Sequence, residues 1–332
     1  MRTELPTEHL HTSELIPYQA YLHKPLIMSD PDIFIVIVTC NRAPLLARTL
    51  QTLSLCHFPE NLRRVIVVEN GATFTAGELV ASFATTLPIE YRQFPHASKC
   101  GALNSALDET RNEFVIFFDD DVRIHEKTLL AYAEAAGGRR GGAFFGGRCL
   151  VDYEEPPEQW LKRYLPASAR GWSLGSEMCP LQSPNALGFN WAAFSADLRS
   201  VGNFDERCGP GTDANGDERN VQERMLRRGI KGYFVPNATV WHHIPRERCS
   251  PAWALQQALR NARGAGLALA EDRRSTRCRK QLESFFKIAA YAAVLQLSRR
   301  WLRPKPLFHG QFMIQRSLGT LEGLKRARVR WQ

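Results

Sequence analysis

The sequence predicts an α/β protein built on a parallel, doubly wound sheet. Three observations support this fold class: apolar runs typical of buried strands, helical spacing between them, and polar residues directly after them. Strands that alternate with helices of this length form parallel sheets with helices on both faces. Ligands of such sheets bind beyond the carboxyl ends of the strands. We therefore expect the functional residues at those ends.

Four segments have the composition of strands in the first half of the chain: residues 33–38, 65–68, 89–93 and 114–118. A helix is expected from Pro44, because proline suits the first helical turn. A second helix is expected over 99–110, where Leu103 and Leu107 lie one turn apart. This alternation predicts the parallel sheet.

The second half is less regular. Paired glycines at 141–142 and 146–147 indicate either a sheet edge or a close approach of two backbones. We expect loop with short helices over 156–184, and a helix over 253–270. Apolar residues from 282 to 294 then recur at helical spacing and predict another helix.

Positive charge is concentrated at the C-terminus. Residues 271–332 contain fifteen Lys or Arg and four Asp or Glu, a balance of +11, whereas the whole chain carries +9. A basic helical segment can contact an anionic membrane surface, bind nucleic acid, or pack on its own domain. No nucleic-acid motif is present, so we expect no nucleic-acid partner and keep the other two interpretations.

The cysteines and the hydropathy pattern predict the compartment. Eight cysteines are scattered without a CxxC pair, which favours reduced thiols over a zinc site or a disulfide framework. The first thirty residues lack the apolar core of a signal peptide. No run reaches the roughly 18 apolar residues of a spanning helix. We expect a cytoplasmic protein, at most peripheral on the cytoplasmic face of the membrane.

Three consecutive carboxylates follow the strand 114–118. Asp119, Asp120 and Asp121, here called the aspartate triplet, repel one another unless a cation neutralises them. A divalent metal does so and also holds phosphate oxygens. The alternative is a set of helix-capping residues, because Asp is favoured before a helix. The preceding buried strand favours a metal–phosphate site.

The order of several segments resembles the family 2 glycosyltransferases, which have the GT-A fold. The resemblance covers about residues 32–245. It rests on five segments in the family's order: Val-Ile-Val-Thr-Cys-Asn-Arg at 36–42, Val-Val-Glu-Asn-Gly at 67–71, Phe-Asp-Asp-Asp-Val at 118–122, Gly-Phe-Asn at 188–190 with Val-Gly-Asn-Phe-Asp-Glu at 201–206, and Gly-Asp-Glu at 216–218.

The resemblance implies an inverting hexosyltransferase that uses Mn²⁺ or Mg²⁺. Its donor would be a UDP-, GDP- or dTDP-linked sugar, and its acceptor a saccharide or a lipid-linked sugar. Such an enzyme would serve the synthesis of a cell-surface polysaccharide or glycoconjugate. The basic C-terminal helices would then provide the membrane contact.

The resemblance also implies a domain organisation. An N-terminal arm (1–31) precedes a GT-A catalytic domain (32–245) and a basic helical extension (246–332). Within the catalytic domain, the nucleotide-binding half is expected at about 32–125 and the acceptor half at about 140–245.

The triplet corresponds to the family's DxD motif. Asp121 is expected to bind the metal directly, and Asp119 to face the ribose or the metal. Asp120 is assigned to the nucleotide side or to the turn itself, since successive strand residues point in opposite directions. His242 occupies the place of a late histidine that completes the metal shell.

The remaining nucleotide-sugar contacts are expected from residues at the other strand ends: Thr39, Asn41, Arg42, Glu69 and Lys99. Each has a structural alternative. The segment from Asn41 to Pro44 reads equally as a capped turn into a helix, Glu69 as a strand end, and Lys99 as an exposed cation.

An inverting transfer needs a general base for the acceptor hydroxyl. The family has Gly-Glu-Asp at this place, whereas this chain has Gly216-Asp217-Glu218. Positional correspondence makes Glu218 the base, and Asp217 the alternative if the turn shifts by one residue. Acids also favour a helix N-terminus for electrostatic reasons alone.

Contacts to the acceptor are expected from Asn190 and Trp191. Trp160, Trp172 and Trp191 offer aromatic faces on which a sugar can stack, and they serve equally well as core residues.

Two alternative functions lie outside this activity. A non-catalytic nucleotide-binding or assembly protein on a degenerate GT-A fold is supported by the swapped Asp217-Glu218 pair. A sugar nucleotidyltransferase requires a glycine-rich loop after the first strand. The segment Thr39-Cys40-Asn41-Arg42 lacks that loop.

Overall fold

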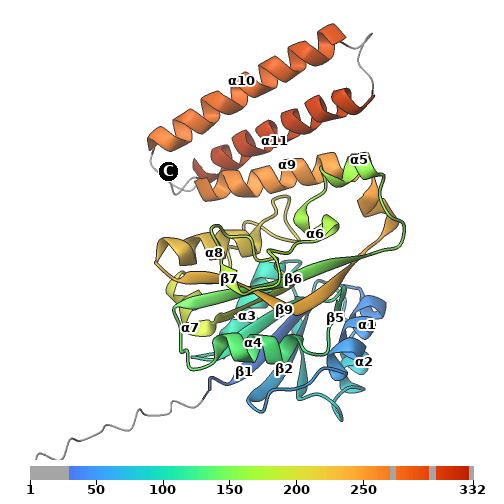
Figure 1. The fold of residues 1–332 in the computed structure, drawn as a ribbon, viewed down its shortest axis with the longest axis vertical. Helices are drawn as coiled ribbons and strands as arrows, with labels where there is room; N and C mark the ends of the chain where they lie inside the picture. The colour runs from blue at the N-terminus through green and yellow to red at the C-terminus, as the bar shows by residue number, and fades with distance from the viewer. Residues whose placement is uncertain (1–29, 270–273, 299–303, 329–332) are drawn as a thin grey trace, which may run out of the picture.

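One mixed sheet forms the centre of the protein (Figure 1). The computed structural model describes residues 30–269, 274–298 and 304–328, so the predicted N-terminal arm lies almost wholly outside the described residues. Within them, eight of the nine strands follow the order β3-β2-β1-β4-β8-β6-β9-β5, and the ninth, β7, pairs with β9. The strands are β1 Ile33–Thr39, β2 Leu62–Asn70, β3 Ile89–Phe94, β4 Phe114–Asp119, β5 Val122–Ile124, β6 Ala143–Tyr153, β7 Cys179–Pro180, β8 Asn190–Phe194 and β9 Lys231–Ile244.

Helices cover both faces of this sheet and form a further layer at the C-terminus. They are α1 Ala43–Ser54, α2 Gly77–Ala81, α3 Lys99–Leu107, α4 Thr128–Ala136, α5 Gln159–Lys162, α6 Ala167–Arg170, α7 Ser195–Ser200, α8 Asp217–Arg227, the 3-10 turn η1 Arg246–Cys249, α9 Pro251–Ala268, α10 Arg274–Ser298 and α11 Pro304–Arg328. The short helices α5 and α6 fall in the predicted loop region.

The parallel half of the sheet confirms the sequence prediction. Strands β3, β2, β1 and β4 are all parallel. Thr39 pairs with Glu69, and Val38 pairs with Asp119. The carboxyl ends of the three strands therefore meet at one edge, where the predicted site residues lie.

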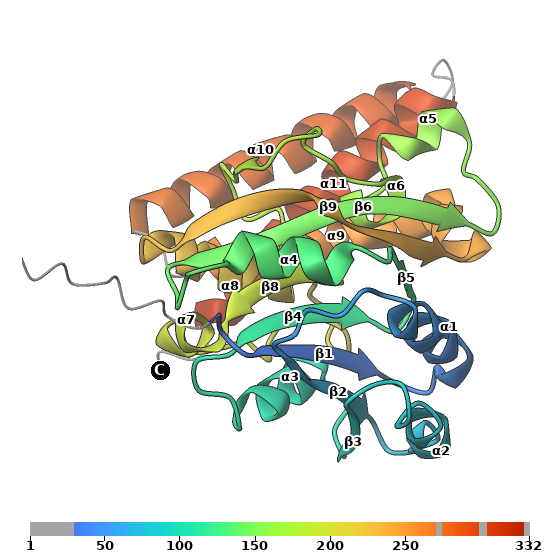
Figure 2. The same cartoon turned by 60° about the horizontal axis from the view of Figure 1, so that its bottom comes forward.

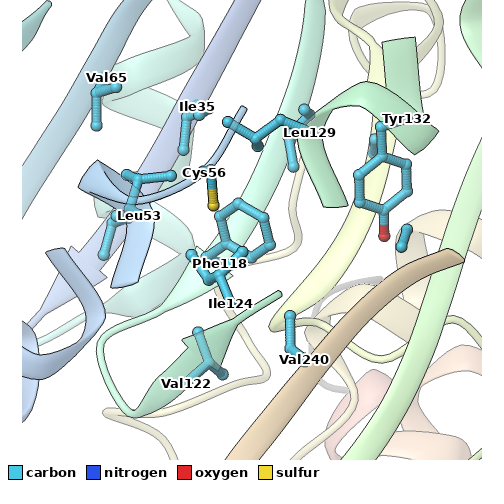
Figure 3. Packing of buried hydrophobic residues seen from close by; sticks show 14 of the residues in the cluster. Ile35, Leu53, Cys56, Val65, Phe118, Val122, Ile124, Leu129, Tyr132 and Val240 are labelled. Carbon is cyan, nitrogen blue, oxygen red and sulfur yellow. The ribbon is translucent and has the colours of Figure 1, made fainter. Parts of the chain in front are cut away.

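Alternate residues of β1 enter two separate cores. Ile33, Ile35 and Ile37 pack in the core that α1, α2 and α4 cover. Phe34 and Val36 pack in the opposite core, with α3 and α8. Figure 2 shows α3 and α4 on opposite sides of β1 and β4. Figure 3 shows the first core at close range. Because both faces are covered, the strands read as continuous apolar runs.

The second half of the sheet departs from the parallel arrangement. Strand β8 is antiparallel to both β4 and β6, whereas β6 and β9 are parallel. Strand β5, directly after the aspartate triplet, is antiparallel to the end of β9 and pairs Val122 with His242. This short pairing brings a distant histidine to the triplet.

The second pair of glycines, Gly146-Gly147 in β6, marks a close backbone approach and no sheet edge. Strand β6 lies inside the sheet, between β8 and β9. A Cβ atom on Gly147 would overlap the carbonyl oxygen of Ala238 and the side-chain amide of Asn190. Of the two interpretations of these glycines, the sheet edge is wrong.

The C-terminal helices pack closely on one another through glycines. A Cβ on Gly319 or Gly323 of α11 would overlap a backbone carbonyl of α9. A Cβ on Gly264 of α9 would overlap the carbonyl oxygen of Asn215, in the loop before α8. The extension is thus helical, as expected, and it contacts the loop that leads to Asp217.

Ion pairs fix that contact. The largely buried Arg263 of α9 lies 3.0 Å from the carboxylate of Asp213 and donates from Nε to Glu322 of α11 over 2.8 Å. Arg326 of α11 also binds Asp213. Arg260 donates to the side-chain oxygen of Asn215 over 3.1 Å. Two helices therefore hold residues 213–215, directly before the start of α8.

The glycine contact predicts a stability effect. In Gly264→Ala the added methyl group meets a backbone carbonyl that cannot rotate away. We expect the free energy of unfolding to fall by about 2 kcal/mol, typical of overpacking. Thermal unfolding followed by circular dichroism measures the change as a lower Tm.

Gly310→Ala is the matched control, since Gly310 is also a helical glycine. Its added methyl group meets the terminal methyl of Leu295 at 2.9 Å, a flexible side chain that can move. Alanine also favours the helix by about 1 kcal/mol. We expect an unchanged or higher Tm. Equal losses of Tm in the two variants would contradict the proposed contact.

Candidate functional site

The aspartate triplet is held in a fixed turn between β4 and β5. The hydroxyl of Thr49 in α1 donates to the carbonyl oxygens of Asp120 and Val122, each over 2.8 Å. The backbone N–H of His243 in β9 donates to the carbonyl oxygen of Asp121 over 2.9 Å. The turn is therefore fixed from both sides, and the three carboxylates have defined directions.

Each carboxylate of the triplet lies against a cation. Asp119 pairs with Nζ of Lys99, at the start of α3. Asp120 lies 2.8 Å from Arg42, and Asp121 lies 2.5 Å from the same guanidinium. Nη1 of Arg248 in η1 lies 3.5 Å from Asp121. The repulsion that the sequence predicts is thus relieved by cations from three elements.

The environments of the carboxylates make them chemically unequal. Burial raises the pKa of Asp120 to about 7, although Arg42 opposes this. Burial also acts to raise the pKa of Asp121, but His242 and Arg42 outweigh it and lower that pKa. Asp121 is therefore the carboxylate held firmly ionised, as a metal ligand must be.

Asp121 and His242 fit a divalent metal. The buried Oδ1 of Asp121 accepts no hydrogen bond from the described residues, and Nε2 of His242 lies 3.4 Å away. Nδ1 of His242 lies 2.7 Å from the carbonyl oxygen of Ser168, and its ring stacks on Phe189 at 4.3 Å between centroids. A carbonyl on the far nitrogen is the usual support for a metal-binding imidazole.

A third protein ligand is not yet in place. Among the described residues, no three His, Cys, Asp or Glu side chains are gathered as a metal-binding group. Asp119, the other predicted ligand, is occupied by Lys99. Metals such as Mg²⁺ are commonly held by one or two carboxylates and substrate phosphates. The donor set therefore fits a metal that enters together with a nucleotide.

One cavity joins Asp119, the first residue of the triplet, to the acidic start of α8. It has a volume of about 610 Å³, and Lys99, Asp119, Asp217 and Glu218 all line it. Nζ of Lys99 lies 3.9 Å from Asp217, so one cation faces both acidic groups. Burial opposes the charge of Lys99, but Asp119 and Asp217 raise its pKa. A volume of several hundred Å³ is typical of small-molecule sites.

The two acids of α8 have different surroundings. Gly216 precedes the helix in the left-handed region, with φ of 100°, and Asp217 is buried. Glu218 lies over Gly188, where an added Cβ would come within 3.3 Å of the carboxylate. Burial, followed by the charge of Asp217, raises the pKa of Glu218 well above its usual value. A carboxylate with a raised pKa is suited to proton transfer near neutral pH.

Two residues predicted to bind the nucleotide instead bind protein groups. The buried hydroxyl of Thr39 donates to Asp120 over 2.7 Å. The fully buried carboxylate of Glu69 accepts from the backbone of Thr75 and Ala76 and from the hydroxyl of Tyr91. Their side chains are held by protein groups in this structure, and their contact with a ligand stays a prediction. Thr39 supports the triplet, and Glu69 orders the loop after β2.

The other residues predicted to bind the nucleotide lie where a ligand can reach them. Asn41 is exposed, has φ of 54°, and accepts a hydrogen bond of 2.6 Å from Thr73. The side chain of Arg42 is one-third exposed. Lys99 lines the cavity. These three residues stay candidates for contact with a nucleotide sugar.

The predicted acceptor contacts of Asn190 and Trp191 are wrong. Both residues are fully buried in β8. The amide of Asn190 donates to the carbonyl oxygens of Arg148 and Ala238, and its oxygen accepts from Tyr132. Trp191 stacks on Phe117 at 4.9 Å. Their polar and aromatic groups hold the sheet together and are not available to a sugar.

The other two tryptophans differ in whether they border the cavity. Trp172 lines the cavity. Trp160 packs edge-on against Phe308 of α11, with 5.2 Å between ring centroids. Of the three tryptophans considered for stacking, only Trp172 borders the site.

The structure adds residues that sequence reasoning missed. Arg248 approaches Asp121, and the carbonyl of Ser168 binds His242. The signal for Arg248 was its place six residues after His242, in a short basic segment. Ser168 had no sequence signal, because a backbone carbonyl carries none.

Comparisons with known proteins show which proteins the chain is similar to. Residues 34–201 match the family model described as Glycosyl transferase family 2. The chain is 28% identical over 254 residues to the succinoglycan biosynthesis protein ExoM of Rhizobium meliloti (strain 1021). The matched region covers 74% of this chain and 78% of ExoM.

Two solved structures share the fold. The mannosyltransferase PcManGT from Pyrobaculum calidifontis, in complex with GDP-Man and Mn²⁺, has a TM-score of 0.57 at 18% identity, over 89% of this chain and 88% of that one. Residues 1–349 of S. aureus TarS, in complex with UDP-GlcNAc, have a TM-score of 0.54 at 14% identity, over 89% and 91%. These similarities concern the fold.

The expected GT-A fold is therefore confirmed, with a C-terminal helical layer added to it. Because the family model spans just over half of the 332 residues, the chain belongs to glycosyl transferase family 2 and is a glycosyltransferase.

Proposed function

We propose that this protein is an inverting, metal-dependent glycosyltransferase that acts in the assembly of a cell-surface polysaccharide. It would take the sugar from a nucleoside-diphosphate sugar and pass it to a saccharide or lipid-linked acceptor at the cytoplasmic face of the membrane. One observation carries the proposal: a single cavity contains both the Lys99–Asp119 pair and the Asp217–Glu218 pair. The name of the relative ExoM, a succinoglycan biosynthesis protein, supports a polysaccharide acceptor.

On the donor side, cations would hold the diphosphate. Arg42, Lys99 and Arg248 surround the triplet and could exchange their carboxylate partners for phosphate oxygens. Asp121 and His242 would bind the metal, joined by Asp119 once Lys99 turns to the phosphate. A bound divalent cation offsets the charge that develops on a leaving diphosphate. Complexes of PcManGT and TarS support a nucleotide-sugar donor, whereas the nucleotide of this chain stays open.

On the acceptor side, Glu218 would act as the base. As the acceptor oxygen bonds to the anomeric carbon, its proton passes to the Glu218 carboxylate, and the bond from that carbon to the diphosphate breaks. The nucleoside diphosphate leaves, and attack from the opposite face inverts the anomeric configuration. Asp217, near Lys99, would keep that lysine directed into the cavity.

The division into a nucleotide half (32–125), an acceptor half (140–245) and a C-terminal extension (246–332) is part of the same proposal. Lys99 and the triplet belong to the first half, and Gly188 and Glu218 to the second. The cavity lies between them and also borders α9.

The degenerate, non-catalytic alternative rests on the swapped acids alone. The raised pKa of Glu218 and its place in the shared cavity favour catalysis. Binding of a nucleotide with no turnover of any sugar donor would support the alternative.

Removing the proposed metal ligand tests the donor side. We expect Asp121→Asn to lower metal-dependent turnover by about 100-fold or more, because a metal supplies several kcal/mol of charge stabilisation. Donor turnover is measured across a Mn²⁺ titration. Asp152→Asn, a change of a half-exposed carboxylate paired with Arg48, should leave turnover intact. Full wild-type activity in excess chelator would rule out the metal role.

Removing the proposed base tests the acceptor side. We expect Glu218→Gln to lower sugar transfer by roughly 1000-fold, the size of a general-base contribution, while donor affinity stays unchanged. Product formation measures the transfer, and calorimetry measures the donor affinity. Asp108→Asn, an exposed acid at the end of α3, is the control. Undiminished transfer by Glu218→Gln would show that the base is another group.

The raised pKa of Glu218 predicts the pH dependence. A base acts when it is ionised, so transfer should rise with pH, at values above the usual range of a glutamate. Because the charge of Asp217 contributes to this pKa, Asp217→Asn should move the rising limb to lower pH. Rates of transfer measured against pH locate the rising limb in the wild type and in Asp217→Asn. An unmoved limb in Asp217→Asn would argue against Glu218 as the titrating group.

A further inference from the structure

Helix α10 is apolar on two opposite faces. One face packs on α11: Leu295 lies against Gly310, and the ring of Tyr291 is 5.9 Å from that of His309. Ser284, on the same side, is buried. In Figure 1, α10 is the outermost helix, beyond α11. Its inner face thus accounts for its attachment to the protein, and its outer face requires a separate explanation.

The outer face carries five large apolar side chains that are exposed. They are Leu282 (59% exposed), Phe285 (61%), Phe286 (73%), Val294 (50%) and Leu297 (81%). At 3.6 residues per turn these positions share one side of the helix. The row is roughly 22 Å long at 1.5 Å per residue. Exposed alanines at 289, 290 and 293 lie between them. A contiguous apolar face of this kind marks an interaction surface.

The charge around this face selects its partner. Helix α10 contains five Lys or Arg and one Glu, and residues 271–332 as a whole carry +11. Arg274 and Arg279 are exposed, whereas Lys280 and Lys287 flank Glu283. A second copy of the chain would bring two strongly basic helices together. An anionic lipid surface instead complements the charge and accepts the aromatic side chains.

None of the helices in the described part of the chain is long and apolar enough to cross a membrane. A helix with an apolar face and basic residues can bind a bilayer by lying along its surface.

We propose that the outer face of α10 binds the surface of an anionic lipid membrane, with Leu282, Phe285, Phe286, Val294 and Leu297 among the acyl chains and the basic residues at the headgroups. The proposal does not rest on the transfer chemistry, because α10 contributes no residue to the cavity lining. It gives a function to the positive charge of residues 271–332, and none of these that the structure describes lines the cavity.

Vesicle flotation of the full chain tests the proposal. We expect binding to phosphatidylcholine vesicles that contain phosphatidylglycerol, and binding at least about tenfold weaker without the anionic lipid. The double variant Phe285→Ser/Phe286→Ser should lower binding to the anionic vesicles by about tenfold or more. Leu55→Ser is the matched control, since Leu55 is 71% exposed but follows α1, and its binding should equal the wild type.

Two further measurements separate this surface from the active site and from self-association. The double variant should keep its circular dichroism spectrum and its turnover of a soluble donor. Vesicle binding is measured without any transfer reaction, so a failure of the proposed transferase activity would not change the membrane result. Equal vesicle binding by the double variant and the wild type would overturn the proposal. Light scattering that shows a wild-type dimer, broken by the double variant, would assign the face to a second copy instead.

Discussion

The site depends on the neutralisation of negative charge at the end of β4. Three adjacent carboxylates there are stable only because cations reach them from separate parts of the chain. Lys99 comes from α3, Arg42 from the turn after β1, and Arg248 from η1. Each of these cations is also a group that phosphate oxygens can bind. In the proposed mechanism, the same cations would exchange their carboxylate partners for phosphate oxygens.

Lys99 links the two halves of the site. Its ammonium pairs with Asp119 and lies 3.9 Å from Asp217, so it lies between the aspartate triplet and the acidic start of α8 in one cavity. A change in its partner on one side alters the charge felt on the other. The two ends are thus coupled electrostatically: burial and the charge of Asp217 raise the pKa of Glu218, and the positive charge of Lys99 opposes that rise.

The C-terminal helices contribute to the site without entering its chemistry. Arg260 and Arg263 of α9, with Glu322 and Arg326 of α11, hold the backbone and side chains of residues 212–215. That segment leads directly to Gly216 and Asp217. Some basic residues of the C-terminus, such as Arg326, therefore form ion pairs within the protein. In the proposed membrane contact, the basic residues of α10 would face the lipid headgroups.

The parallel half of the sheet, its strand ends, the aspartate triplet and the acidic start of α8 can all be read from the sequence alone. These features are local, because apolar runs and helical spacing follow from burial along one stretch of chain. Which polar residues face the cavity depends on the tertiary fold. Asn190 and Glu69 look like ligand residues in sequence, but both are buried against protein partners. His242 joins Asp121 through the antiparallel pairing of β5 with β9, and α10 exposes its second apolar face through its packing on α11. Such contacts join residues far apart in the chain, so no local pattern specifies them.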